Sequence, residues 1–197
     1  MKSLKEYVEE GLLDRVKNKE VSHEILIEEF LKENYKIDGP YAIKTTDKGF
    51  VVDVRGGDIE VKNENITSLT NGLFRFGDDC GFWCSDCNSL KSLEGAPKEV
   101  GWSFDCSKSH SLRTLEGAPE KVKGDFDCSD CKSLKTLEGA PKKVDRYFYC
   151  RGCKLLKSLE GAPKEVDAIY CSDCGVQFTE EDVRKYTNIV GRIFMEL

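Results

Sequence analysis

Histidine is scarce in this sequence, since only His23 and His110 occur among 197 residues. It is the side chain most often used for acid–base catalysis near neutral pH, and neither copy lies beside a motif for a nucleophile. A glycine-rich loop that would cradle phosphate groups is also missing. We therefore expect a protein that is not an enzyme and needs no cofactor, with both histidines facing solvent.

Positive charge is in deficit, because 30 lysine and arginine residues face 36 aspartate and glutamate residues, for a formal net charge of −6. Proteins that bind nucleic acids use clustered basic side chains that release counterions from phosphates. This balance argues against a nucleic-acid partner. A hydrophobic content of 39% and a charged content of 34% are instead typical of a soluble globular chain.

Long apolar runs are absent from the first residues, MKSLKEYVEEGLLDRV, which mix charges with apolar residues every three or four positions. This pattern favours neither a signal peptide nor a membrane span. We therefore expect a cytoplasmic protein without a membrane partner. In a reducing cytoplasm, the ten cysteines are expected to be free thiols rather than a disulfide framework.

A repeat of 22 residues organises most of the chain. Its four full copies and a truncated fifth are CSDCNSLKSLEGAPKEV from Cys84, CSKSHSLRTLEGAPEKV from Cys106, CSDCKSLKTLEGAPKKV from Cys128, CRGCKLLKSLEGAPKEV from Cys150 and, after 21 residues, CSDCGVQF from Cys171. One copy has too few apolar residues to form a core alone. The copies are therefore expected to coil, with one copy per turn and equivalent side chains stacked in columns.

Each copy places its apolar residues in the same order. An aromatic residue or isoleucine lies two positions before the first cysteine, at Phe82, Phe104, Phe126, Phe148 and Ile169. The alternation in Phe-x-Cys predicts a short strand, and Glu-Gly-Ala-Pro predicts a turn or extended segment on the far side. Successive strands would then pair in parallel, roughly 4.8 Å apart.

The pattern Phe-x-Cys-x-x-Cys-x-x-Leu-x-x-Leu resembles the strand and ladder segment of leucine-rich repeats over roughly residues 59–178. The resemblance implies a solenoid of parallel strands with a mostly irregular convex side. It also implies side chains that satisfy backbone groups at the turn, which here would be Cys87, Ser109, Cys131, Cys153 and Cys174. That family usually places one residue, not two, between the ladder position and the next leucine. The repeats are also similar to the largely uncharacterised LEGAP-type repeat proteins of gut bacteria and their phages, which implies a cellular or host-cell cytoplasmic protein.

The two ends are expected to be caps, because a solenoid must shield its first and last coils. Residues 1–40 are predicted to form a helical hairpin, with helices at 3–17 and from Ser22 to near 38–40. Residues 41–58 are predicted to be a β-hairpin that leads into the solenoid of 59–178. Residues 179–197 are predicted to be a short cap, with a helix from the Thr179–Asp182 capping box to about Tyr186 and a strand at 189–195.

The Cys-x-x-Cys pairs leave three interpretations open. Such pairs are typical of zinc sites, and coils stacked about 4.8 Å apart also fall within the Cα spacing of disulfides. Buried thiols that act as small apolar side chains are the favoured interpretation. Val61 and Ser109 take cysteine positions in other coils, which packing tolerates and a ligand set does not, so no metal site is expected.

The outward face of the Phe-x-Cys strands is the candidate binding surface. A residue between two inward columns must face the other way, which gives the row Trp83, Asp105, Asp127, Tyr149 and Tyr170. Its expected neighbours include Asp125, Tyr147 and Arg151. Large exposed aromatics beside charges are favoured at protein interfaces. We therefore expect a non-catalytic protein–protein interaction module that binds its partner on a concave strand face, a host defence protein if the source is a phage.

Other interpretations remain open at this point. The row could be ordinary variable surface, and the chain could be a structural or virion component that docks through its N-terminal helices. Self-association through exposed coil edges, giving a homo-oligomer, is a further alternative.

Overall fold

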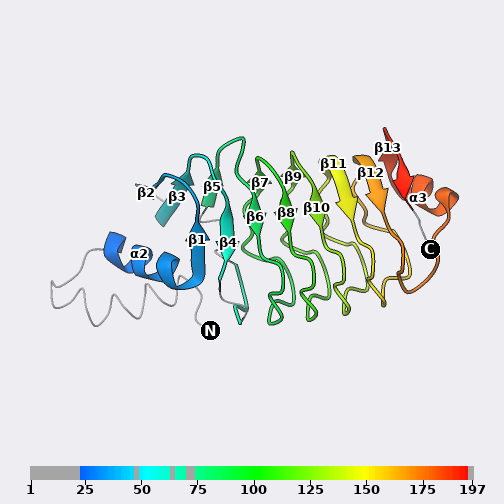
Figure 1. Ribbon diagram of the computed structural model, residues 1–197, viewed down its shortest axis with the longest axis horizontal. Helices are drawn as coiled ribbons and strands as arrows, with labels where there is room; N and C mark the ends of the chain where they lie inside the picture. Colours follow the sequence, from blue (N-terminus) through cyan, green and yellow to red (C-terminus); the bar gives the residue numbers. More distant parts are fainter. Residues whose placement is uncertain (1–22, 47–48, 63–64, 70–73, 195–197) are drawn as a thin grey trace.

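The computed structural model describes residues 23–46, 49–62, 65–69 and 74–194, and this part of the chain is a β-solenoid of about six turns. Figure 1 shows the coils side by side along the long axis, with α2 at one end and α3 at the other. The expected helix at 3–17 lies outside the described residues. The prediction of a parallel-stranded solenoid is confirmed.

A first row of strands, here called the Phe row, is built from the Phe-x-Cys segments. Its strands are β4 (Ile59–Val61), β6 (Phe82–Trp83), β8 (Phe104–Asp105), β10 (Phe126–Asp127), the ends of β11 (Lys143–Tyr149) and β12 (Glu165–Tyr170), and β14 (Ile193–Phe194). All of these neighbours pair in parallel, and the phenylalanines and isoleucines lie opposite one another. The strand prediction for Phe-x-Cys is therefore confirmed.

A second row of strands, here called the Val row, was not predicted. It consists of β7 (Glu99–Val100), β9 (Lys121–Val122), the first residues of β11 and β12, and β13 (Asn188–Ile189). The far side was expected to be mostly irregular, and instead each of these coils carries a second short parallel strand. Bends at residues 101–102 and 123–124 separate the two rows in the coils of β7 and β9, whereas β11 and β12 run through both rows as single strands.

The shortened 21-residue spacing has a definite place in the structure. β11 and β12 pair Val144 with Val166, a separation of 22, but Tyr147 with Ala168, a separation of 21. The register shift between these pairs shows that the missing residue lies within β12, between its Val-row and Phe-row parts. Both rows therefore keep their columns aligned in spite of the deletion.

The N-terminal part differs from the expected hairpin cap. Helix α2 (His23–Asn34) buries the predicted face of Leu26, Ile27, Phe30 and Leu31, but it ends at Asn34 and not near residues 38–40. The next residues form β1 (Tyr35–Ile37), which pairs antiparallel with β4 and covers its edge. Burial of Tyr35, whose ring lies 5.2 Å from that of Phe74, explains the early helix end.

A small second sheet and a terminal helix complete the described fold. β2 (Tyr41–Thr46) and β3 (Gly49–Val54) form an antiparallel hairpin, and β3 pairs in parallel with β5 (Phe74–Phe76). Helix α3 (Glu180–Tyr186) has the expected capping box, since the amide of Asp182 donates to Oγ1 of Thr179. The predicted strand at 189–195 is wrong: β13 and β14 are separate two-residue strands in different rows.

Stacked phenylalanine rings run through the solenoid core. The centroids of neighbouring rings lie 5.5, 5.3 and 5.5 Å apart, and their interplanar angles are 8°, 5° and 7°, along the column Phe82, Phe104, Phe126 and Phe148. All four side chains are fully buried. Removing one such ring typically lowers the free energy of unfolding by about 3–5 kcal/mol, so this column is a main source of stability.

The ten cysteines are free thiols, and nine of them are buried. The thiol of the second cysteine in a coil donates to the backbone carbonyl of the first cysteine in the preceding coil. These bonds run from Cys131 to Cys106 at 3.3 Å and from Cys153 to Cys128 at 3.2 Å. Ser109 makes the same bond to the carbonyl of Cys84 at 3.3 Å. The Cys106 and Cys128 thiols donate in turn to the carbonyls of Asp127 and Tyr149, at 3.3 and 3.2 Å, and burial raises the pKa of both, which favours their neutral form.

Leu-Glu-Gly-Ala forms a tight turn in each full coil. The alanine amide donates to the leucine carbonyl three residues earlier, for example from Ala140 to Leu137 at 3.0 Å. Gly139 has a φ of +85°, which suits the third position of a type II turn. The turn also lies against the backbone of the preceding coil, since a Cβ on Gly139 would be 2.4 Å from the amide nitrogen of Glu116.

We expect Gly139→Ala to lower the free energy of unfolding more than Gly56→Ala. Both glycines have a positive φ, so an alanine at either site costs roughly 1–2 kcal/mol of backbone strain. The Gly139 variant also collides with the preceding coil, whereas nothing lies within 4 Å of the Gly56 position. Urea unfolding followed by circular dichroism measures both losses, and equal losses would contradict this close approach of the coils.

We expect Cys131→Ser to be tolerated better than Cys131→Ala. Serine keeps a donor for the Cys106 carbonyl, as Ser109 does for Cys84, so its loss should stay within about 1 kcal/mol, whereas alanine should lose roughly 1–3 kcal/mol. Thermal and urea unfolding of the reduced proteins provide the comparison. A zinc ligand or a disulfide at Cys131 would instead make the two substitutions equally damaging.

Candidate functional site

The five residues predicted for the outward row lie on neighbouring Phe-row strands in register. Trp83 pairs with Asp105, Asp105 with Asp127, Asp127 with Tyr149 and Tyr149 with Tyr170. Each is partly exposed, while the phenylalanine or isoleucine before it and the cysteine after it are buried. These five residues therefore share one face, opposite to the core.

The register extends this row by one residue at each end. Glu60 pairs with Trp83, and Phe194 pairs with Tyr170. We call the seven residues the outer row: Glu60, Trp83, Asp105, Asp127, Tyr149, Tyr170 and Phe194. Neither end was predicted, because neither flanking strand carries the cysteine that marks the repeat.

Stacked aromatic rings form the C-terminal half of the outer row. The rings of Tyr149 and Tyr170 have centroids 4.5 Å apart, and those of Tyr170 and Phe194 are 4.3 Å apart and parallel. The predicted neighbour Tyr147 meets Tyr149 edge-on at 6.1 Å. Burial, assisted by Asp125, raises the pKa of Tyr149 to about 12, so its hydroxyl is neutral at physiological pH. The result is a partly exposed, uncharged aromatic patch held by ring-to-ring contacts.

Carboxylates occupy the middle of the outer row. Oδ1 of Asp105 accepts from the amide of Ser107 at 2.8 Å, and Oδ1 of Asp127 accepts from the amide of Ser129 at 2.7 Å. Burial raises the pKa of Asp127, and Asp105 raises it further, whereas hydrogen bonds from Ser129 and the charge of Arg151 lower it. The folded protein thus holds this carboxylate in surroundings that disfavour its charge.

The remaining predicted neighbours lie at the margins of the row. Oδ1 of Asp125 accepts from the amide of Tyr147 at 3.2 Å and lies 3.8 Å from Nε of Arg146. Arg151 is exposed in the turn that follows Tyr149, from which its charge reaches Asp127. All eight residues predicted for the site therefore fall on or beside the outer row.

An arginine that was not predicted for the site lies between two aromatic rings beside the outer row. The guanidinium carbon of Arg146 lies 5.6 Å from the ring centroid of Trp102 and 5.3 Å from that of Tyr147. Trp102, Gly124 and Arg146 are each 22 residues apart, so they form one column, and Gly124 has no side chain to separate the other two. The 22-residue spacing of these three positions was therefore sufficient to predict that Trp102 and Arg146 lie in one column.

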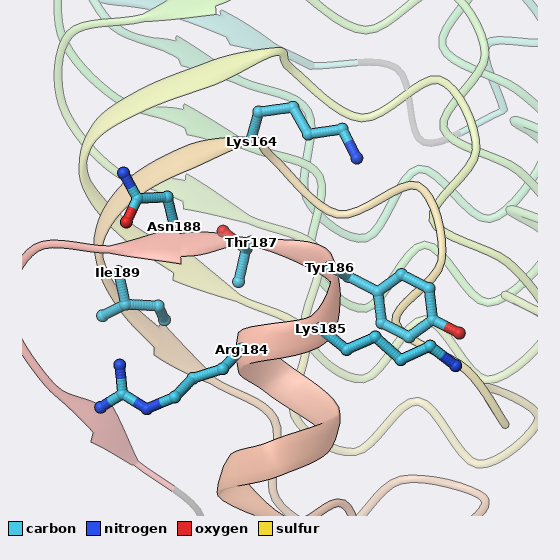
Figure 2. Close-up of a pocket in the computed structure, with 7 residues that line it drawn as sticks. All are labelled: Lys164, Arg184, Lys185, Tyr186, Thr187, Asn188 and Ile189. Atoms are coloured by element: carbon cyan, nitrogen blue, oxygen red, sulfur yellow. The ribbon is translucent and has the colours of Figure 1, made fainter.

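A hollow of about 380 Å³ near α3 is a weaker candidate. It is lined by Lys164, Arg184, Lys185, Tyr186, Thr187, Asn188 and Ile189. Arg184 is bound to Glu180 at 2.6 Å, and Nζ of Lys185 lies 5.0 Å from the Tyr186 ring centroid. Figure 2 shows these two basic side chains extending in opposite directions, so they do not converge on a common ligand position.

No protein-family model, curated protein or solved structure matches this chain. Within the part of the chain that the structure describes, no helix has the length and apolar character needed to cross a bilayer. Among the same residues, no group of three or more His, Cys, Asp or Glu side chains is placed to hold a metal ion. The geometry of the outer row is therefore the basis for a functional assignment.

We expect Asp127→Asn to raise the free energy of unfolding at pH 7, by roughly 0.5 kcal/mol, the scale of a cross-strand pair of like charges. A carboxylate whose pKa is raised by folding stabilises the folded state in acid and loses that contribution as pH rises. The gain should therefore vanish as pH falls through the raised pKa towards the ordinary value of about 3.9.

Chemical denaturation between pH 3 and pH 8 measures this gain. Asp127→Ala is the control, because it removes the charge and also the acceptor for the Ser129 amide, and it should be less stable than Asp127→Asn throughout. A stability difference between wild type and Asp127→Asn that does not change with pH would contradict the electrostatic explanation.

Proposed function

We propose that this protein is a non-catalytic binding module that holds a protein partner on the outer row. One observation carries the proposal: partly exposed aromatic and acidic side chains lie in register on one face of the Phe row, whose opposite face is a repeated core. Tryptophan and tyrosine are the side chains most enriched among residues that dominate binding energy.

The dimensions of the outer row suit a protein partner. Its seven residues span six strand intervals, or about 29 Å at 4.8 Å per interval. Standard interfaces bury about 800 Å² on each partner, so a protein partner would also contact the residues beside the row. A small ligand would need an enclosing pocket, whereas the outer row lies on an open strand face.

Electrostatics also supports a binding role. Asp105 and Asp127 are adjacent in register, and like charges opposite one another on a sheet destabilise it. A surface selected for stability alone would replace or neutralise one of them. Residues that reduce stability in this way are common at functional sites.

The finer structural assignments belong to the same proposal. We assign the coils to the leucine-rich-repeat-like class. The parallel Phe row supports this, as do the hydrogen bonds from the thiols of Cys131, Cys153 and Cys174 to backbone carbonyls of the preceding coil. The Val row departs from the irregular convex side expected for that class. We assign α2 with β1, and α3, as caps. The resemblance to LEGAP-type proteins supports a cytoplasmic partner, which would be a host protein if the source is a phage.

We expect the combined variant Trp83→Ala, Tyr149→Ala, Tyr170→Ala to lose its partner. Removing three aromatic anchors should weaken binding by at least about tenfold. Affinity capture from the lysate of the native host, with the captured proteins identified by mass spectrometry, provides the measurement.

The matched control is Ile25→Ala, Leu155→Ala, Val176→Ala, which removes exposed apolar side chains outside the outer row. Circular dichroism of both variants verifies that they fold. A partner retained by the aromatic variant and by the control would overturn the proposal and direct attention to the N-terminal segment, as the docking alternative requires.

A further inference from the structure

The middle of the outer row concentrates negative charge. Asp105 and Asp127 lie on adjacent strands, about 4.8 Å apart, and Asp125 lies two residues before Asp127 on the same face. Two nearby arginines carry the opposite charge. Arg146 is held by Trp102 and Tyr147, and the charge of Arg151 has only a small lowering effect on the pKa of Asp127. The centre of the row therefore offers two carboxylates to an incoming group.

Aromatic rings flank these carboxylates on both sides. Trp83 precedes Asp105 in the register, and Tyr149 follows Asp127. The two rings are three strand intervals apart, or about 14 Å, and Tyr149 is held by contacts with Tyr147 and Tyr170. A planar cation over Asp127 lies one strand interval, about 4.8 Å, from the Asp105 strand on one side and from the Tyr149 strand on the other. The face of the Tyr149 ring opposite to Tyr170 and the two carboxylates both attract such a cation.

The protein already binds one of its own guanidinium groups with the same kinds of side chain. Arg146 lies over the rings of Trp102 and Tyr147, with Nε 3.8 Å from Oδ1 of Asp125. A tryptophan and a tyrosine two coil intervals apart, with an aspartate on the coil between them, thus hold an arginine. On the outer row, Asp127 has a second aspartate, Asp105, on one neighbouring strand and a tyrosine, Tyr149, on the other.

We propose that the outer row recognises an arginine-bearing segment of its partner, with the guanidinium over Asp127, where it pairs with the carboxylates of Asp127 and Asp105 and stacks on the ring of Tyr149. This inference rests on the proposed function and names the partner chemistry. An anionic segment would meet a chain of net charge −6, and an apolar one would bury two carboxylates without compensation. Arginine is favoured over lysine because its planar group stacks on rings and pairs with two oxygens at once.

The test uses fluorescein-labelled nonapeptides of alternating glycine and arginine, with matched peptides in which lysine, uncharged citrulline or glutamate replaces arginine. Fluorescence anisotropy measures binding to the full chain, and the indole NMR signal of Trp83 reports the location. We expect the arginine peptide to bind most tightly, lysine several-fold more weakly, and citrulline and glutamate not measurably. Equal binding of the arginine and citrulline peptides would overturn the inference.

Variants with matched charge separate local recognition from general attraction. Asp105→Asn, Asp127→Asn should weaken binding of the arginine peptide by at least about tenfold. Glu94→Gln, Glu138→Gln removes the same charge from exposed positions outside the row and should change the affinity less than about twofold. Equal losses in the two variants would show attraction by net charge alone and overturn the inference.

Capture from lysate then separates this inference from the proposed function. If the partner is lost from the Trp83, Tyr149, Tyr170 variant but retained by Asp105→Asn, Asp127→Asn, the binding face stands and the arginine assignment falls. If both variants retain the partner, both proposals fall. Loss from both, together with the peptide preference, supports both.

Discussion

The stacking of equivalent side chains at a spacing of one coil is the interaction on which the rest of this structure depends. Four phenylalanine rings separated by 5.3 to 5.5 Å set the distance between coils, and the backbone hydrogen bonds of the Phe row match it. The thiol-to-carbonyl hydrogen bonds need the same spacing, because the second cysteine of each coil must reach a backbone carbonyl of the preceding coil. The outer row inherits its register from these columns, so its aromatic contacts are also a consequence of the core.

Because the structure depends on this stacking, inward-facing residues determine stability and outward-facing residues are available for recognition. Inward positions face an identical neighbour in the next coil, so a change in one copy disturbs a column, and the copies stay nearly alike. Outward positions are partly exposed, which leaves them free to differ, as the change from Trp83 to Asp105 to Tyr149 shows. The like-charged pair of Asp105 and Asp127 can persist because the columns supply stability elsewhere.

The 22-residue period was sufficient to predict the parallel coils, the Phe row and the central outer row, since each follows from alternation around a repeated cysteine. The Val row was missed because a two-residue Glu-Val or Lys-Val segment has no alternation to detect. The early end of α2 at Asn34 accompanies the burial of Tyr35 and its pairing with Val61, which are contacts between distant residues. The 21-residue spacing indicated a deletion, but only the pairing of β11 with β12 locates it between the Val row and the Phe row. The eight predicted site residues lie on or beside the outer row, whereas the Arg146 stack required knowing which columns lie between the two rows.

Nearest-neighbour stacking also determines how a bound partner would act on the fold. In a solenoid, each coil is stabilised by its two neighbours, so the terminal coils open most readily. A partner that contacts the outer row from Trp83 to Tyr170 touches five successive coils. Opening of the coil that carries Tyr170 would then break contacts with the partner as well as with the coil of Tyr149. Binding and local unfolding are therefore coupled, and a partner that binds only the folded coils stabilises the C-terminal end by an amount that grows with the logarithm of its affinity.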